Sequence, residues 1–289
     1  MVATDYSPRG LRWLYRAVRS RRRAWRPVEN LGFVLGFVGQ VLSSIPLTVR
    51  HYRPQTMRVT TEMTWGRGGA LIVGGGTVPT LAVLGVAMGV SVGIESFATL
   101  DMLGMGPLTG IISAFASTRE LAPIATGIGF AAQAGCRMTA EIGSMRISEE
   151  IDAIESLGLR SVPLVVTTRV IAGVVAIVPT FLVALILAYV SCRLVIVTAH
   201  GQSPGVYEHY FFQFISGADV FAAVLKVVVF TVAVILIHCY YGFFATGGPE
   251  GVGIASGRAV RASFVAVIAL DMVLSLALWG FHSSIEFTG

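Results

Sequence analysis

The feature that most constrains this chain is a series of long apolar stretches almost free of charge. Residues 68–94 contain no Asp, Glu, Lys or Arg, and four similar stretches follow. These cover residues 107–135, the segment between Arg169 and Arg193, residues 217–244 and residues 262–285. About 20 apolar residues in a helix cross a bilayer, and within lipid only helices or closed barrels satisfy the backbone polar groups. Charged residues make up 13% of the chain, about half the share in soluble domains. The sequence therefore predicts an all-α polytopic membrane protein with five transmembrane helices.

The stretch 31–49 is also long enough to cross the membrane, but basic residues flank it on both sides. Arg26 precedes it, and Arg50 and Arg53 follow it. A crossing would place one of these basic clusters outside, against the usual enrichment of Lys and Arg in cytoplasmic loops. Its apolar side chains also recur at helical spacing. We therefore expect an interfacial elbow helix that lies in the membrane surface.

The distribution of arginines predicts the orientation of the chain. Eight arginines fall within residues 1–26, which we interpret as a basic cytoplasmic tail held near anionic lipid. Residues 27–66 then form the elbow helix and its connector, and residues 67–289 form the five-helix membrane domain. The loop after the first span has no Lys or Arg, whereas residues 136–161 and the loop at Arg258 and Arg261 contain arginines. The N-terminus is thus predicted inside and the C-terminus outside.

Four ionisable side chains are predicted to lie within the membrane: Arg119, Glu120, Lys226 and Asp271. A lone charge at the bilayer centre costs at least ~2.5–3.5 kcal/mol, so such groups normally pair or line a wet cavity. Arg119 and Glu120 are adjacent, and their side chains diverge on a helix. We expect partners on other helices, Glu120 with Lys226 and Arg119 with Asp271. The pairs either fix helix packing or form a polar constriction beside an apolar pocket. Such a constriction suits a ligand with one charged headgroup and apolar tails.

A short acidic helix is predicted on the cytoplasmic side, at about residues 146–158. Ser148 is a good N-cap, acidic residues in the first turn suit the helix dipole, and Gly158 suits the C-terminal end. The helix is about half as long as a bilayer crossing requires. It is either a solvated loop or a segment that inserts an apolar stripe into a groove on a partner. Its candidate contact residues are Ile147, Ser148, Glu149, Glu150, Ile151, Asp152, Ile154, Glu155 and Leu157.

Three glycines at helical spacing, Gly85, Gly89 and Gly93, form a ridge of small residues on the first span. Such a ridge lets another helix approach closely. Two alternatives remain open: ordinary packing within the chain, or a seam between two subunits.

The sequence lacks the motifs of an enzyme. Lys226 is the only lysine and lies in a span, so the chain has no phosphate-binding loop with a Gly-Lys-Ser/Thr ending. We find no zinc-binding spacing and no nucleophile motif, and we interpret the three cysteines as core thiols. We therefore expect no catalytic residues, no metal site and no cofactor in this chain.

Three segments carry a family resemblance: Thr118–Pro123, Ala140–Gly158 and Cys239–Gly253. They resemble the MlaE/YrbE family, the permease subunits of MCE-type lipid ABC transporters, and the likeness extends over roughly Gly32–Ser275. The resemblance implies an elbow helix, five spans, a permease dimer, and a cytoplasmic ABC ATPase dimer docked on the coupling helix near Ser148–Leu157. ATP and Mg²⁺ would be bound by that ATPase. It also implies an MCE-protein assembly outside the cell membrane and a translocation region lined by Arg119, Glu120, Lys226 and Asp271.

Two positions depart from the family pattern. Glu150 stands where many relatives carry Gln, and Gln133 stands where many carry Arg. These departures favour a heterodimer, in which this chain looks like the B-type of two unlike YrbE subunits, in a system that imports lipids or fatty acids across the cell envelope. Two other functions remain open: an ion-coupled secondary transporter of an amphipathic substrate, in which Glu120 or Asp271 carries a proton, and a non-transporting scaffold for the ATPase.

Overall fold

The structure is a computed structural model that describes residues 32–66 and 75–280. Within these residues every regular element is helical, and the only β-type pairing is an isolated bridge between Gly66 and Gly75. The predicted all-α fold is therefore confirmed. Contacts divide the chain between Ser43 and Ser44, so the helix at residues 32–43 is described separately from the helices that follow. The basic tail, residues 1–26, lies outside the described residues.

Five helices in the described part of the chain are long and apolar enough to cross a membrane. They are Gly32–His51, Thr77–Asp101, Pro163–Thr198, Gly217–Phe243 and Gly248–Trp279. This set differs from the predicted one in two members. It includes the segment that we expected to lie in the interface, and the interfacial position of that segment remains a prediction. It leaves out residues 107–135, which carry Arg119 and Glu120 and which the structure divides into α-helical and π-helical pieces.

The helical rod at residues 106–147 changes its winding repeatedly. It comprises a 3₁₀ turn (Gly106–Leu108), α5 (Thr109–Ala116), the π-helix η3 (Ser117–Leu121), α6 (Ala122–Phe130), the π-helix η4 (Ala131–Gly135) and α7 (Cys136–Ile147). Pro123 explains the π-helix η3, since proline lacks the N–H of an α-helical hydrogen bond and its ring crowds the preceding turn. Single π-helical turns of this kind often mark functional positions.

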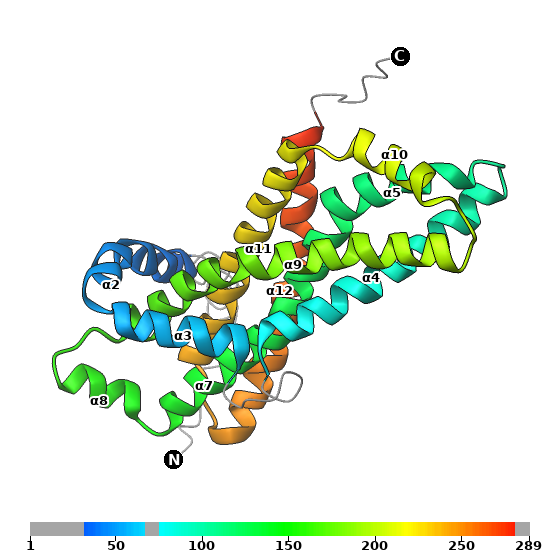
Figure 1. The fold of residues 1–289 in the computed structure, drawn as a ribbon. Coiled ribbons are helices and arrows are strands. Elements are labelled where there is room, and N and C mark those ends of the chain that lie inside the picture. Colours follow the sequence, from blue (N-terminus) through cyan, green and yellow to red (C-terminus); the bar gives the residue numbers. More distant parts are fainter. Residues whose placement is uncertain (1–31, 67–74, 281–289) are drawn as a thin grey trace, which may run out of the picture. The chain divides into compact units, whose positions relative to one another are not determined.

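The glycine ridge packs within the chain. α4 (Thr77–Asp101) runs beside α9 (Thr168–Thr198), as Figure 1 shows. A Cβ atom at Gly85 or Gly89 would overlap the carbonyl oxygens of Ala184 or Ala188, and one at Gly93 would lie 3.3 Å from the Cys192 carbonyl oxygen. The three glycines thus let two membrane helices meet backbone to backbone. Of the two alternatives for this ridge, the structure takes intrachain packing.

The last two membrane helices, α11 (Gly217–Phe243) and α12 (Gly248–Trp279), pack against each other and against the rod at residues 106–147 (Figure 1). α12 begins at Gly248 instead of residue 262, so Arg258 and Arg261 lie within the helix and not in a loop. A favourable start explains this difference, because Pro249 occupies the first turn after the left-handed Gly247. The connecting loop is therefore short, and α12 carries both arginines on its first half.

The short helix α10 (Pro204–Phe214) packs over α5. Tyr207 is buried there and donates a hydrogen bond to Ser113 Oγ at 2.9 Å. Burial raises the pKa of the Tyr207 phenol, so this side chain stays protonated. α10 thereby fixes the end of the rod that leads into the charged π-helix.

Candidate functional site

Lys226 is the centre of a charged cluster contributed by three elements. Its side chain is fully buried in α11 and is surrounded by η3 and α12. The ammonium nitrogen lies 3.3 Å from Glu120 Oε2 and 2.7 Å from Asp271 Oδ1. It also donates to Ser275 Oγ at 2.8 Å, and Ser275 in turn donates to Glu120 Oε1 at 2.7 Å. One ammonium thus holds two carboxylates and a hydroxyl together.

The π-helix supplies a further acceptor for Lys226. Its ammonium donates to the backbone carbonyl oxygen of Arg119 at 2.8 Å. In an α-helix that carbonyl would accept from the N–H of residue 123, but residue 123 is a proline and has none. Within the membrane an unsatisfied carbonyl costs several kcal/mol. Lys226 therefore stabilises the backbone of the winding defect that presents Arg119 and Glu120.

Of the two predicted ion pairs, one is confirmed and one is wrong. Glu120 pairs with Lys226 as predicted, whereas Arg119 does not pair with Asp271. The Arg119 guanidinium binds Asp219 instead, with 2.9 Å between Nη2 and Oδ2. Asp271 joins Lys226 because it lies one turn before Ser275 on the same face of α12. The charges therefore form two neighbouring groups, one around Lys226 and the other around Arg119.

Arg119 lies in an aromatic and acidic environment. Its guanidinium carbon is 3.5 Å from the centre of the Phe115 ring and 5.2 Å from the Trp279 ring. The Trp279 indole N–H donates to Asp219 Oδ1 at 2.8 Å, so one carboxylate binds both groups. Cation–π contacts and a paired carboxylate offset the loss of water around a charge that is 11% exposed. Trp279 connects this pair to Lys226, whose ammonium is 5.3 Å from the same ring.

The cluster is accessible from one side. The Lys226 side chain is fully buried and that of Asp271 is 10% exposed, but the Glu120 side chain is 41% exposed. Two carboxylates share one ammonium at this point, and Glu120 is the exposed, negatively charged edge of the cluster. No group of three or more metal-binding side chains occurs in the part of the chain that the structure describes. The arrangement is suited to polar contact and charge pairing within the membrane.

The cytoplasmic helix predicted from the sequence is α8 (Glu150–Ser156). Its beginning differs from the prediction, because Ser148 ends α7 and Glu149 caps α8 with a left-handed backbone, φ 59°. Its end follows the prediction. Gly158 has φ 76°, its N–H donates to the Glu155 carbonyl, and the N–H of Leu159 donates to the Ile154 carbonyl. This pair of hydrogen bonds is a Schellman motif, which fixes the helix end.

The apolar stripe of α8 is divided between the interior and the surface. Ile151 is fully buried and anchors the helix, whereas Leu157 is 77% exposed and Ile147 is 40% exposed. The acidic residues Glu149, Glu150, Asp152 and Glu155 are also exposed. Arg146 holds Asp152 at 2.6 Å. The structure thus presents a fixed helical corner with a mixed acidic and apolar surface.

Sequence reasoning missed three residues of the cluster: Asp219, Ser275 and Trp279. Asp219 lies near the end of a span, where a charge does not require a partner as strongly as at the bilayer centre. A signal was present, since Asp219 and Lys226 are two helical turns apart and therefore lie on one face of α11. Asp271, Ser275 and Trp279 likewise repeat every four residues and form one stripe on α12. The sequence therefore indicates a polar stripe on each of two neighbouring helices. It does not indicate which residue of one stripe lies opposite which residue of the other.

Comparison of the sequence with known proteins identifies a family. Residues 69–277 match the family model described as Permease MlaE. A probable ABC transporter permease protein of Rickettsia bellii is 26% identical over 205 residues, 71% of this chain and 79% of that protein. The intermembrane phospholipid transport system permease protein MlaE of Haemophilus influenzae is 27% identical over 197 residues, 68% of this chain and 76% of that protein.

A plant protein is similar as well. Protein TRIGALACTOSYLDIACYLGLYCEROL 1, a chloroplast protein of Arabidopsis thaliana, is 30% identical over 188 residues. The match covers 65% of this chain and 54% of the plant protein, so the chain spans about half the length of that relative.

Proposed function

Because this chain belongs to the MlaE permease family, we propose that it is the membrane subunit of an ATP-driven transporter that moves lipids or fatty acids across the cytoplasmic membrane. The family match covers most of the chain, and the names of two relatives describe ABC transporter or phospholipid transport permeases. A permease subunit requires several transmembrane helices, and the chain has five helices long and apolar enough to cross a membrane in its described part. The subunit is a transporter component and not an enzyme, and a separate ATPase binds ATP and Mg²⁺.

The observation that carries this proposal is the exposed corner at α8. Leu157 is 77% exposed beside several carboxylates, and the Schellman motif holds it in one position. An apolar stripe on a short helix fits a groove on a partner protein. We propose that a cytoplasmic ABC ATPase dimer receives this corner. Buried Ile151 then transmits movement of α8 to the membrane helices behind it.

The charged cluster is the proposed polar element of the substrate pathway. Arg119, Glu120, Lys226 and Asp271 lie together within the membrane, and Glu120 is the accessible member. A lipid has one polar head and apolar tails, and Glu120 and the half-exposed Leu121 present both kinds of surface side by side. We propose that this face meets the dimer partner and lines the cavity at the permease dimer interface.

The proposed assembly contains more than one kind of subunit. We propose a heterodimer with a second YrbE-type permease, an MCE-protein assembly on the outer side, and transport in the import direction. The N-terminus is proposed inside and the C-terminus outside. The heterodimer is proposed because Glu150 and Gln133 depart from the pattern of the family that the sequence resembles. This arrangement places α8 on the ATPase side and α10 on the MCE side.

Co-purification of the ATPase tests the proposal. The chain is produced in its native host and purified through a tag, and the double variant Glu149→Lys, Glu150→Lys is compared with the natural sequence. Reversal of two exposed charges should abolish recovery of the ATPase and leave the membrane yield unchanged. Arg258→Glu, an exposed charge reversal on α12, is the control. Equal recovery with both variants would contradict docking at α8. Lipid uptake that persists after deletion of the ATPase gene would instead support the ion-coupled transporter.

A further inference from the structure

A second polar site lies far from the Lys226 cluster. A cavity of about 200 Å³ lies among α3 (Arg53–Trp65), α7 and the beginning of α9. Along the rod at residues 106–147, Glu120 and Arg137 are separated by 17 residues, or ~25 Å at 1.5 Å per residue. The cavity is therefore at the other end of the membrane body, on the side of α8. None of the residues that line it belongs to the charged cluster around Lys226.

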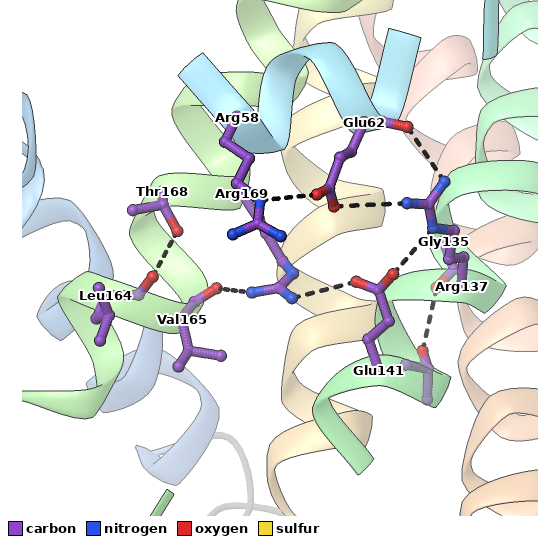
Figure 2. A network of polar contacts seen from close by, with 10 residues as sticks. Arg58, Glu62, Gly135, Arg137, Glu141, Leu164, Val165, Thr168 and Arg169 are labelled. Carbon is purple, nitrogen blue, oxygen red and sulfur yellow. Dashed lines mark hydrogen bonds and ion pairs between the residues drawn. The ribbon is translucent and has the colours of Figure 1, made fainter. Parts of the chain in front are cut away.

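Five charged side chains at the cavity form a continuous chain of ion pairs (Figure 2). Glu62 lies between Arg58 and Arg137, at 3.0 Å and 3.7 Å. Glu141 lies between Arg137 and Arg169, at 2.9 Å and 3.2 Å. The chain alternates in sign and has an arginine at each end. It links the connector helix α3 to the helix that leads into α8.

The described lining residues carry an excess of positive charge. Three guanidinium groups face two carboxylates, which leaves one net positive charge at the cavity. Arg169 and Arg137, which are only 11% and 26% exposed, are paired with the two carboxylates, so the excess charge falls on Arg58 at the open side of the cavity. A monovalent anion that contacts Arg58 and Arg137 would balance the charge of the cavity. Guanidinium groups are also the preferred partners of phosphate and carboxylate oxygens.

The remainder of the cavity wall is apolar. Met63, Met138, Met145 and Val59 line it beside the arginines. Methionine side chains are flexible and adapt to irregular apolar ligands. A free inorganic anion makes no favourable contact with an apolar wall. A lipid can place its charged headgroup on the arginines and the first carbons of its acyl chains on the methionines. The wall therefore favours a lipid over a dissolved anion.

We propose that this cavity binds the monoanionic headgroup of a membrane lipid, with its oxygens on Arg58 and Arg137. Basic pockets between membrane helices commonly bind anionic headgroups near the cytoplasmic surface. The site holds α3 against α7 and adds a lipid to the contacts that position α8. Only the assignment to the cytoplasmic leaflet rests on the proposed function, because it follows from the proposed topology.

A photoreactive phosphatidylglycerol tests the site directly. The purified full chain is placed in nanodiscs of phosphatidylcholine, the probe is added and activated, and labelled peptides are identified by mass spectrometry. Labelling should concentrate on α3 and α7. A phosphatidylcholine probe of the same design measures non-specific contact. Equal labelling of these helices by the two probes would overturn the proposal.

Charge variants of opposite sign test the role of the arginines. Arg58→Gln removes the positive excess and should lower labelling about fivefold, the effect expected for one basic residue at a membrane surface. Arg58 is 72% exposed, so the variant should fold normally. Glu62→Gln raises the excess and should increase labelling. Arg53→Gln is the matched control, since Arg53 is an exposed arginine on the same helix that does not line the cavity.

Two further outcomes overturn the proposal. If Arg53→Gln lowers labelling as much as Arg58→Gln, the probe follows general surface charge and not the cavity. If a large excess of inorganic phosphate displaces the lipid probe from the natural sequence, the cavity is a site for a free anion. The assay includes neither ATPase nor transport, so it can fail while the proposed function holds, or succeed while that function fails.

Discussion

The side-chain ammonium of Lys226 donates a hydrogen bond to the backbone carbonyl oxygen of Arg119, with 2.8 Å between the two atoms. Pro123, four residues after Arg119, cannot supply the usual N–H. Lys226 therefore has two roles, because it completes the backbone of the π-helix and also balances Glu120 and Asp271. The polar cluster is built into the helix geometry and is not an addition to a regular span.

Replacement of the lysine should be more harmful than replacement of either acid. Lys226→Met leaves two carboxylates and one carbonyl without their shared donor, and breaking such a buried ion pair costs about 3–5 kcal/mol. We expect a large loss of thermal stability in detergent and of lipid transport in liposomes. Asp271→Asn should have a smaller effect, and the double variant Lys226→Met, Asp271→Asn should be more stable than Lys226→Met alone. A double variant that is no more stable would show that the two side chains are not coupled.

A charge swap between Glu120 and Lys226 should not restore function. The pairing alone suggests that Glu120→Lys with Lys226→Glu would re-form the ion pair. In the structure, however, a glutamate at position 226 would face Asp271 and could not donate to the Arg119 carbonyl. We expect the double variant to transport no better than either single variant, as measured in liposomes. Recovery of transport would mean that the pair with Glu120 is the only contact of Lys226 that matters.

These residues show what the sequence can and cannot specify. The four intramembrane charges were readable because an isolated charge in an apolar span needs a partner, and the pair of Glu120 with Lys226 was predicted correctly. The partner of Arg119 was not, because the choice between Asp219 and Asp271 depends on the rotation of α11 and α12 about their axes. The Ser148 cap was also wrong, since α7 extends to Ile147 and uses Ser148 as its own end. Tertiary packing decides both rotation and helix ends.

Asp219 should matter more than its position near a helix end suggests. It accepts from both Arg119 and Trp279, so Asp219→Ala leaves a buried guanidinium without this carboxylate. We expect lower thermal stability and reduced transport. Glu95→Ala is the matched control, since Glu95 also lies near a predicted membrane surface but is exposed. Equal effects of the two variants, measured by thermal unfolding and by uptake, would count against a specific role for the pair.

The glycine ridge gives a test of packing within the chain. In Gly89→Ala the new methyl group would overlap the Ala188 carbonyl oxygen, so α4 and α9 must separate. Overpacking of this kind costs about 1–3 kcal/mol, and the thermal unfolding temperature of the isolated subunit should fall. Gly257→Ala on α12 is the control, because no atom lies within 4 Å of its added methyl group. If Gly89→Ala impaired only subunit association and left the isolated chain as stable as before, the ridge would act between subunits.

Matched alanine variants separate the two sides of the short cytoplasmic helix. Ile151 is fully buried, so Ile151→Ala should destabilise the chain by about 2–5 kcal/mol, as other buried aliphatic truncations do. Leu157 is 77% exposed, so Leu157→Ala should leave the thermal unfolding of the purified subunit unchanged.

If the ATPase docks on this corner, however, Leu157→Ala should lower the co-purification of the ATPase and its lipid-stimulated ATP hydrolysis in the assembled complex. Truncation of a surface leucine that contacts no partner should change neither stability nor ATPase binding. Unchanged stability together with lost ATPase binding would therefore assign Leu157 to an interface. Normal recovery of the ATPase with Leu157→Ala would remove this side chain from the proposed contact and leave only the acidic residues to carry it.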